Sequence, residues 1–302
     1  MSIRLKRGDG GPNAKEFERS LIVDFQTSIN CVGAMLVVDG DFGIATEQAV
    51  KYVQQFNGYQ ITGMVDNRLL EWSAGLENPF PSLNVNGIAY IAQVETGGLS
   101  YYHRNSKFPH YPGGPSGITI GVGYDIGQQN ANEFRKTWQQ YLSAEQLNEL
   151  IKDVRNDGKS NRGSKARARS LARKGIEIPF NIAWQVFAEQ TLPAYFDKTA
   201  DIYPSLLGLP DHCRSALVSL VYNRGNAVGN SDRRREMKNI QSLLAAADDL
   251  SLTNQQRASI LIGVENEFDK MKRLWQTGSG LIQRRQAEAN MWRKGVSLLK
   301  SE

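Results

Sequence analysis

Hydrophobic residues recur at helical spacing in the segment that ends near position 95. Ile88 and Ile91 precede Glu95 at this spacing, so the pattern predicts an amphipathic helix whose apolar stripe includes Glu95. Gly97 and Gly98 follow and are typical of a helix end. Glu95 would therefore lie in the last turn, half removed from water at the edge of a cleft. A carboxyl in such a place suits a general acid.

The pattern becomes alternating between positions 118 and 125, as in a strand. The apolar or aromatic positions are Ile118, Ile120, Val122 and Tyr124, and small or polar residues lie between them. One straight strand would separate Thr119 from Asp125 by about 20 Å, at about 3.3 Å per residue. A tight turn at residues 121–123 would instead bring them directly opposite each other, with Cβ atoms about 5 Å apart. We predict this hairpin, which would present a hydroxyl and a carboxylate to one water molecule.

Beyond the hairpin, the pattern is helical almost to the end of the chain. A capping box from Ser143 to Gln146 predicts a helix start, and residues 182–196 and 216–222 carry further helical stripes. No internal repeat suggests a solenoid. We therefore predict a mostly α (α+β) fold with one small β-hairpin.

The N-terminal region has its own turn and core pattern. The turn comprises Asp39, Gly40, Asp41, Phe42 and Gly43, and it leads into a helix capped near Thr46. The residues expected to form a small core are Leu21, Phe25, Ile29, Val50, Val53 and Phe56.

Residues 14 to 74 resemble a peptidoglycan-binding domain of the small three-helix type. The motifs that carry the resemblance are Phe25-Gln26, Asn30 to Gly33, Val38 to Gly43, Thr46, Ala49-Val50, Gln54 and Thr62 to Asp66. The pattern departs from the family at residues 67–70, Asn-Arg-Leu-Leu, which replace a more usual Thr-containing helix start. The resemblance implies a wall-binding module in which residues 39–43 contribute to peptidoglycan binding.

The run from Thr119 to Asp125, with Glu95 some two dozen residues upstream, resembles the muramidase domain of pesticin and, more loosely, the phage-type lysozymes. Segments 215–225 and 280–288 resemble helices that close the lysozyme cleft in that group. The resemblance implies Glu95 as general acid, Asp125 as general base or water-holding carboxylate, and Thr119 as the residue that positions the water. Many phage lysozymes carry their Asp before the Thr, but residues 111–116 contain none, so Asp125 follows the pesticin-like arrangement.

Further residues are candidates for the sugar groove. The substrate-binding candidates are Tyr124, Tyr222, Asn223 and Arg224, and for the two tyrosines a place in the core is the open alternative. Arg284 and Arg285 we expect to be structural or salt-bridged. The predicted organisation is a peptidoglycan-binding domain at 1–76, a short proline-stiffened linker at 77–84 and a lysozyme-like domain at 85–302.

Composition fits a protein that folds without a membrane. The 302 residues are 40% hydrophobic and 22% charged, with no apolar stretch near the roughly 18 residues needed to cross a bilayer. The first residues lack the apolar core of a secretory signal, so we expect synthesis in the cytoplasm and action on the wall in the periplasm. We also expect a monomer. Cys31 and Cys213 lie in apolar helical contexts of different predicted domains, so we expect two buried thiols.

The net charge of +5 is concentrated in one segment. Between Arg155 and Lys174 lie Lys159, Arg162, Lys165, Arg167, Arg169 and Arg173. The segment is either a solvated, mobile loop with an exposed helix face, or a surface attracted to the acidic wall. No nucleic-acid signature accompanies the charge, so nucleic acid is not an expected partner.

Together these features predict a bacteriolytic N-acetylmuramidase that cleaves the β-1,4 MurNAc–GlcNAc bond of peptidoglycan without a cofactor or metal. The three histidines lack the spacing of zinc ligands, which disfavours an amidase. The alternatives are a lytic transglycosylase, which also uses one Glu as acid, and a non-catalytic wall-binding protein. The biological setting is a phage endolysin or a delivered antibacterial effector, the latter with an immunity protein as partner.

Overall fold

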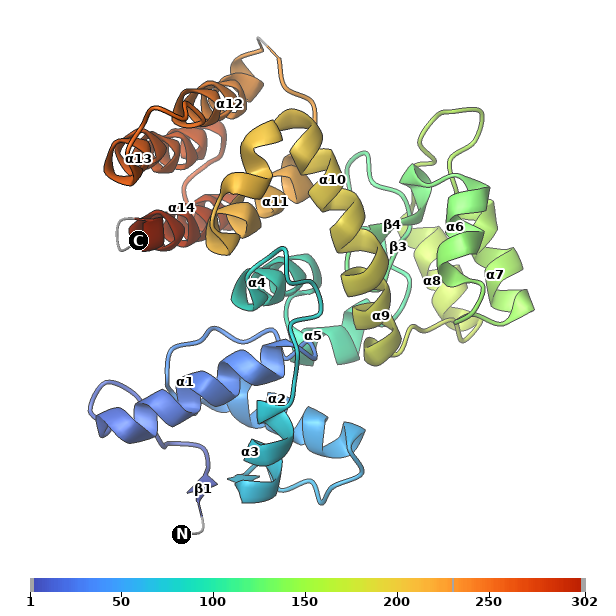
Figure 1. The fold of residues 1–302 in the computed structure, drawn as a ribbon. Helices are drawn as coiled ribbons and strands as arrows, with labels where there is room; N and C mark the ends of the chain where they lie inside the picture. Colours follow the sequence, from blue (N-terminus) through green and yellow to red (C-terminus); the bar gives the residue numbers. More distant parts are fainter. Residues whose placement is uncertain (1–2, 230, 300–302) are drawn as a thin grey trace. The chain divides into compact units, whose positions relative to one another are not determined.

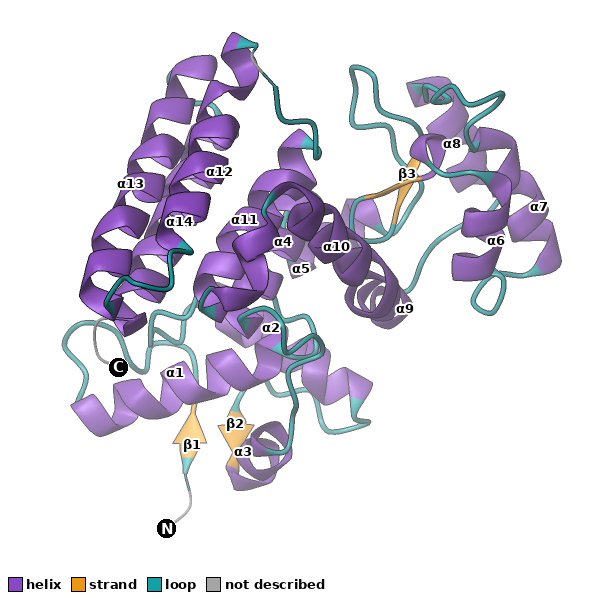
Figure 2. Ribbon diagram, turned by 45° about the horizontal axis from the view of Figure 1, so that its top comes forward, coloured by secondary structure: helices purple, strands orange, loops and turns teal. Residues whose placement is uncertain are grey.

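The computed structural model describes residues 3–229 and 231–299, and this part of the chain is mostly helical (Figure 1). Within the described residues, strands occur only as short two-stranded antiparallel pairs (Figure 2). The predicted mostly α class is therefore confirmed. The chain divides into two compact units: the residues up to Pro79 with Ala89–Thr191, and Phe80–Ile88 with the residues from Leu192 onward. The predicted domain boundaries stay a prediction.

The first unit contains both strand pairs. Strand β1 (Arg4–Leu5) pairs with β2 (Val65–Asp66), and β3 (Thr119–Ile120) pairs with β4 (Tyr124–Asp125). Its helices are α1 (Glu16–Asn30), α2 (Ile44–Phe56), α3 (Asn67–Ala74), α5 (Leu99–Tyr101), α6 (Ala131–Trp138), α7 (Ala144–Leu150), α8 (Lys165–Arg173) and α9 (Phe180–Val186). Helix α4 (Val85–Thr96) contributes its first turn to the second unit and its remainder to the first.

Short 3₁₀-helical and π-helical segments lie between these elements or continue them. The 3₁₀ segments are Ile126–Gln128, Ile151–Asp153, Pro204–Gly208, Asp232–Arg234 and Lys272–Leu274, and the π segments are Tyr102–Ser106 and Phe187–Thr191. The helix expected at 182–196 is thus interrupted by a π segment. Pro193 follows that segment and has no amide to donate to the carbonyl four residues back, which explains why the regular ladder fails there.

The N-terminal core forms from most of the expected residues. Phe25, Ile29, Val50 and Val53 are at most 2% exposed. Phe56 was expected in this core, but its side chain is 58% exposed because it is the last residue of α2 and lies beyond the buried turns. Leu21 is only half-buried, and its neighbour Ile22 takes the core position at 0% exposure.

The second unit is built from helices. They are α10 (Leu192–Ile202), α11 (Asp211–Arg224), α12 (Arg235–Ala247), α13 (Asn254–Met271) and α14 (Gly280–Leu299). Helices α12, α13 and α14 lie side by side in Figures 1 and 2. Helices α11 and α14 approach closely at Gly295, where an added Cβ would lie 2.4 Å from Cys213 Sγ. The Trp292 indole of α14 donates a 2.7 Å hydrogen bond to the Leu261 carbonyl of α13.

Both cysteines are buried free thiols, as expected. Burial raises the pKa of the Cys31 and Cys213 thiols, which keeps them in the neutral form. Among the described helices, none combines the length and the apolar character needed to cross a membrane.

Candidate functional site

Glu95 lies in the last turn of α4, as the hydrophobic pattern predicts. Ile88 and Ile91 are fully buried on the apolar stripe of this helix, and Glu95 is half-buried. Gly97 and Gly98 have φ of 81° and 88°, a left-handed conformation that ends the helix and that L side chains rarely adopt. The glycine pair therefore fixes Glu95 at a helix end with access to water.

The predicted hairpin is present with the predicted register. Thr119 lies opposite Asp125, and Ile120 lies opposite Tyr124. Gly121 and Gly123 turn the chain with φ of 56° and 68°. The alternation of the sequence thus brings Thr119 and Asp125 together across one strand pair.

The Asp125 carboxylate is held by backbone amides. The Gly117 amide donates to both carboxylate oxygens at 3.1 Å, and the Gly127 amide donates to Oδ1 at 2.9 Å. Burial raises the pKa of Asp125, and these amides, with that of Gln128, oppose the rise. Asp125 therefore caps the turn that follows it and also places a desolvated carboxyl beside Thr119.

A third segment extends the hairpin on its other edge. The amides and carbonyls of His110 and Thr119 exchange hydrogen bonds of 2.9 and 2.8 Å. Thr119 is consequently 4% exposed between two neighbours. Burial lowers the pKa of His110, so the imidazole is neutral at pH 7. Sequence reasoning missed His110 because a bridge across a nonrepetitive loop leaves no periodic signal.

Three glycines allow the segments around Asp125 to approach one another. A Cβ on Gly117 would lie 2.4 Å from Asp125 Oδ1, and one on Gly127 would lie 2.1 Å from the Asn161 carbonyl oxygen. A Cβ on Gly163 would lie 2.8 Å from the Gly117 carbonyl carbon. Real Cβ atoms do not come this close, so these positions require glycine.

Gly117→Ala should destabilise the protein by about 1–3 kcal/mol, because the new methyl displaces a held carboxylate and backbone rather than a flexible side chain. The φ of Gly117 is not positive, so the effect would come from contact alone. Urea unfolding monitored by circular dichroism measures it. Gly280→Ala is the control, since its Cβ meets nothing within 4 Å. Equal unfolding midpoints for the two variants would contradict the close packing.

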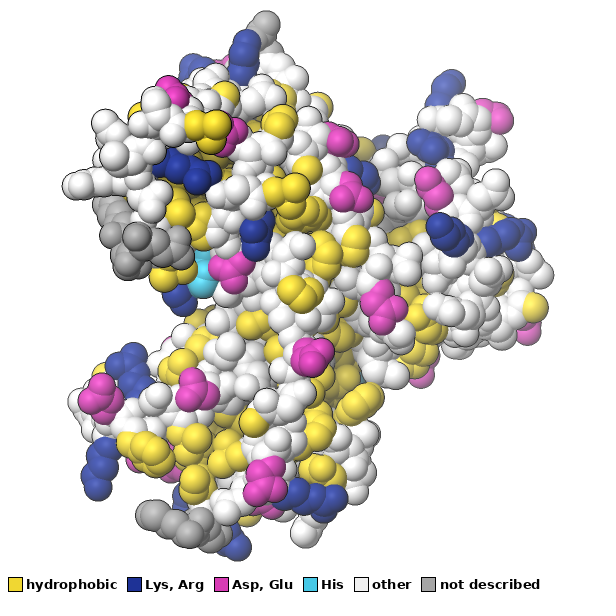
Figure 3. Space-filling model, viewed as in Figure 1, with side chains coloured by type: hydrophobic (Ala, Val, Ile, Leu, Met, Phe, Trp, Pro, Cys, Tyr) yellow, Lys and Arg dark blue, Asp and Glu magenta, His cyan; other side chains and the backbone are white. Residues whose placement is uncertain are grey.

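The basic segment after α7 is tied to the hairpin by its backbone. Amides of Arg155, Asn161 and Gly163 donate to carbonyls in residues 116–129, at 2.8, 3.0 and 2.9 Å. Its exposed cations are Arg155, Lys159, Arg162, Lys165, Arg169 and Arg173. Figure 3 shows Lys and Arg side chains on the part of the molecule that carries α6–α8. The surface beside the hairpin is therefore cationic.

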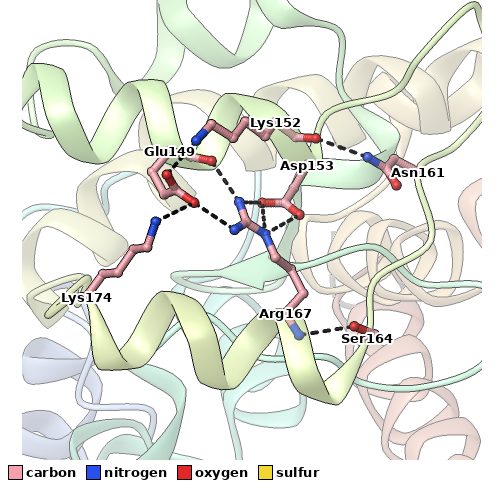
Figure 4. A network of polar contacts seen from close by, with 7 residues as sticks. All are labelled: Glu149, Lys152, Asp153, Asn161, Ser164, Arg167 and Lys174. Atoms are coloured by element: carbon pink, nitrogen blue, oxygen red, sulfur yellow. Dashed lines mark hydrogen bonds and ion pairs between the residues drawn. The ribbon is translucent and has the colours of Figure 1, made fainter.

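Arg167 differs from these six exposed cations because it is half-buried within an ion-pair network (Figure 4). Its guanidinium donates to the Asp153 carboxylate at 2.7–3.0 Å and to Glu149 Oε1 at 2.7 Å. Lys152, Arg167 and Lys174 together lower the pKa of Glu149 to about 2. Arg167 thus anchors α8 to α7, and it is not part of the exposed charge.

A shallow depression of about 360 Å³ lies between His110–Tyr111 and α8. Its lining includes the exposed Lys165 and Arg169 and the less exposed Ala168 and Ala172. The depression borders the strand that pairs with Thr119 and carries positive charge, so it can accept an anionic or polar chain next to the hairpin.

Tyr124 occupies the core beneath the hairpin. Its ring is 9% exposed and lies edge-on to Trp138 at 5.4 Å between ring centroids. Burial raises its pKa to about 12. Of the two alternatives left open for this residue, the observed packing corresponds to a core position.

Tyr222, Asn223 and Arg224 lie together at the C-terminal end of α11, in the second unit. The Tyr222 ring stacks on Tyr195 with centroids 4.2 Å apart. Asn223 Oδ1 accepts a 3.3 Å hydrogen bond from Arg285. The Arg224 guanidinium lies 5.4 Å from the Trp275 ring centroid, and desolvation with nearby arginines lowers its pKa to about 10. All three side chains are half-buried, which leaves part of each accessible.

Arg284 and Arg285 are salt-bridged inside the second unit, as expected. Both pair with Glu288 on the same helix, which also accepts a 2.7 Å hydrogen bond from Ser219 of α11. Arg285 and Glu288 are 0% exposed. This buried charge network holds α14 to α11 and thereby the end of α11.

The turn at residues 39–43 is built around a buried glutamine of α1. The Gln26 amide nitrogen donates to Asp39 Oδ1 and to the Asp41 carbonyl, both at 3.0 Å, and its oxygen accepts from the Gly40 amide at 3.0 Å. Phe42 is 0% exposed in the core. Helix α2 begins two residues before Thr46, with Gly43 as its N-cap. The sequence pattern that defines this turn is thus largely a folding requirement.

Gln54 plays the same part in α2. Its side-chain oxygen accepts hydrogen bonds from the amides of Thr62 and Gly63, both at 2.9 Å, and its nitrogen donates to the Met64 carbonyl at 2.8 Å. Two helices therefore each present one buried glutamine that satisfies the backbone of a following turn.

Residues 18–72 match the model of the family described as "Putative peptidoglycan binding domain". The match supports an N-terminal peptidoglycan-binding domain, with peptidoglycan as a partner and the cell wall as the place of action. No curated protein and no solved structure matches the chain.

Proposed function

We propose that the protein is a peptidoglycan hydrolase, an N-acetylmuramidase that cleaves the β-1,4 MurNAc–GlcNAc bond. The observation that carries the proposal is the hairpin register. It places Thr119, which bears a hydroxyl, opposite Asp125, whose carboxyl is desolvated. Glu95 supplies a second carboxyl, at the end of α4 in the same unit. Two carboxyls with different surroundings are the requirement for cleaving a glycosidic bond by acid and base.

In the proposed reaction, Glu95 donates its proton to the oxygen that leaves C1 of the MurNAc ring. A water molecule held by Asp125 and Thr119 attacks C1 from the other face while Asp125 accepts the proton of that water. The bond from C1 to the leaving oxygen breaks, a bond from C1 to the water oxygen forms, and the anomeric configuration inverts. No cofactor or metal takes part. Tyr222, Asn223 and Arg224 are proposed to contact the glycan.

The surroundings of the hairpin suit this substrate. The exposed cations of residues 155–173 favour an anionic wall, whose stem peptides carry carboxylates, and the depression beside His110 offers a place for them. Because the N-terminal domain binds peptidoglycan, it would raise the local concentration of the glycan strand at the proposed catalytic residues. The enzyme would act as a phage endolysin or as a delivered antibacterial effector countered by an immunity protein.

A lytic transglycosylase is the second candidate. The observation that favours it is that both carboxylate oxygens of Asp125 accept hydrogen bonds from backbone amides. An Asp with only a structural role in the turn would make the same hydrogen bonds. A transglycosylase needs only the acid and lets the substrate close its own ring, so it would leave Asp125 with a structural task.

Two substitutions at Asp125 separate these functions. Asp125→Asn keeps an oxygen for the Gly117 and Gly127 amides, so stability should stay within about 1 kcal/mol while the rate of bond cleavage falls about 10²–10⁴-fold. Asp125→Ala should lose about 1–3 kcal/mol of stability as well. The measurements are urea unfolding and mass spectrometry of fragments released from isolated sacculi.

The wild-type enzyme should release fragments with reducible MurNAc ends, and its rate should fall as pH drops through the pKa of Asp125. Because burial raises that pKa, the fall begins at a higher pH than for a solvated Asp, and it should disappear in Asp125→Asn. Full activity of Asp125→Asn with anhydro-muramic ends would make the protein a transglycosylase. Binding without fragments would leave a wall-binding protein.

A further inference from the structure

A pocket in the first unit lies away from the hairpin and has no part in the proposed reaction. It has a volume of about 310 Å³ and lies between α2 and the segments around residues 103–107 and 177–181. The volume is at the lower end of small-ligand sites, which is the size expected for a single small ring system. Three of its lining residues, Tyr52, Gln55 and Phe56, belong to the segment that matches the peptidoglycan-binding family.

One wall of the pocket is aromatic. The Tyr52 ring lies 5.5 Å from the His103 ring and 5.4 Å from the Phe180 ring, measured between centroids. Burial raises the pKa of Tyr52 to about 12, and burial together with Lys107 lowers that of His103. At pH 7 both rings are therefore neutral, and the wall offers flat apolar faces with polar edges.

Phe56 extends this wall to the rim. Its ring is nearly parallel to that of Tyr52, with an interplanar angle of 28°, yet its side chain is 58% exposed. A large aromatic left in water forgoes the free energy that burial would give it. Because Phe56 lines a pocket, its exposed ring can stack against a ligand bound there.

The rim also has a polar part, in which the charges balance. Lys107 Nζ and Glu177 Oε2 form a 2.7 Å ion pair, and both residues line the pocket. The exposed amides of Gln55 and Asn181 add donors and acceptors. Because the charges cancel, this rim does not select an anion such as phosphate. It suits a neutral ligand with several hydroxyl and amide groups.

We infer that this pocket binds one neutral N-acetylhexosamine ring of a glycan strand, with Phe56 and Tyr52 against the C–H face of the sugar and the rim amides at its hydroxyl and acetamido groups. The inference rests on the peptidoglycan association in the proposed function and names the sugar-binding surface of that association. It does not require that the bond be cleaved.

Isothermal titration calorimetry of the full chain with tetra-N-acetylchitotetraose tests the pocket. Phe56→Ser should weaken binding about tenfold, because it removes the exposed stacking face with little loss of buried packing. Phe17→Ser is the matched control, since Phe17 is a 74% exposed phenylalanine of α1 that does not line the pocket. A double variant Gln55→Ala/Asn181→Ala should also weaken binding, and retention on isolated sacculi should follow the same order.

The outcomes distinguish this inference from the proposed reaction. Equal affinity of wild type, Phe56→Ser and Phe17→Ser would overturn the sugar site, even if sacculi are cleaved with reducible ends. Absence of any binding to the tetrasaccharide would overturn it too. Loss of binding only in the pocket variants would establish the site, even if no bond is cleaved.

Discussion

Glu95→Gln is expected to lower the rate of glycan cleavage by about 10²–10⁴-fold or more, while binding to sacculi stays at the wild-type level. The amide has nearly the shape of the carboxyl but carries no acidic proton for the leaving oxygen. Glu95 is half-buried at the glycine-terminated end of α4, so the substitution should leave the fold intact. The wall-binding domain at 18–72 does not include the residue.

The measurement is the rate at which fragments with reducible MurNAc ends leave isolated sacculi, with a pelleting assay for binding. Glu145→Gln is the control, because it makes the same chemical change at an exposed position of α7. Wild-type cleavage by Glu95→Gln would remove Glu95 from the mechanism. Reducible N-acetylglucosamine ends would instead move the cut to the other glycosidic bond.

Glu288→Gln should destabilise the protein by about 3–5 kcal/mol, the largest stability effect that we expect. Glu288 is 0% exposed and pairs with two buried arginines, at 2.8 Å to Arg285 Nη2 and 3.4 Å to Arg284 Nε. Removing its charge leaves two guanidinium groups in the interior without their counter-ion. Water cannot reach them to replace it.

The control for this prediction is Glu265→Gln on α13. Glu265 pairs with Arg293, whose side chain is 58% exposed, so losing that pair should cost at most about 1 kcal/mol. Urea unfolding at neutral pH, followed by far-ultraviolet circular dichroism, compares the two. Equal losses would mean that the Glu288 network is as solvated as a surface pair, contrary to the observed burial.

The sequence determined the local elements around the candidate site. Helical spacing followed by Gly97-Gly98 was sufficient to place Glu95 at a helix end, and alternation around Gly121 and Gly123 was sufficient for the register of Thr119 with Asp125. These features depend on periodicity and on backbone angles that glycine alone adopts easily. Short-range information therefore fixed them.

The hydrophobic pattern of the sequence predicted less well which side chains are buried at helix ends and beside turns. Phe56 has the spacing of a core residue, but the helix ends there and the ring lies at the rim of a pocket. Gln26 and Gln54 belong to the motifs of the family resemblance. Only the structure shows that each is buried and hydrogen-bonded to the backbone of a turn. The partners of the two glutamines lie in turns, and Phe56 lies beyond the last buried turn of its helix, so a periodic pattern carries no information about either.

By itself, the sequence determined a mostly helical fold, a peptidoglycan-binding N-terminal segment, two buried thiols and one hairpin that pairs a hydroxyl with a carboxyl. Only the tertiary structure decided that backbone amides hold the Asp125 carboxylate, that His110 flanks Thr119, and that the basic segment is tied to the hairpin. These contacts involve segments without a periodic pattern, such as the turn after β4, the loop at His110 and residues 155–163. They depend on which backbone groups remain unpaired after the regular elements have formed, and that is settled by packing rather than by residue spacing.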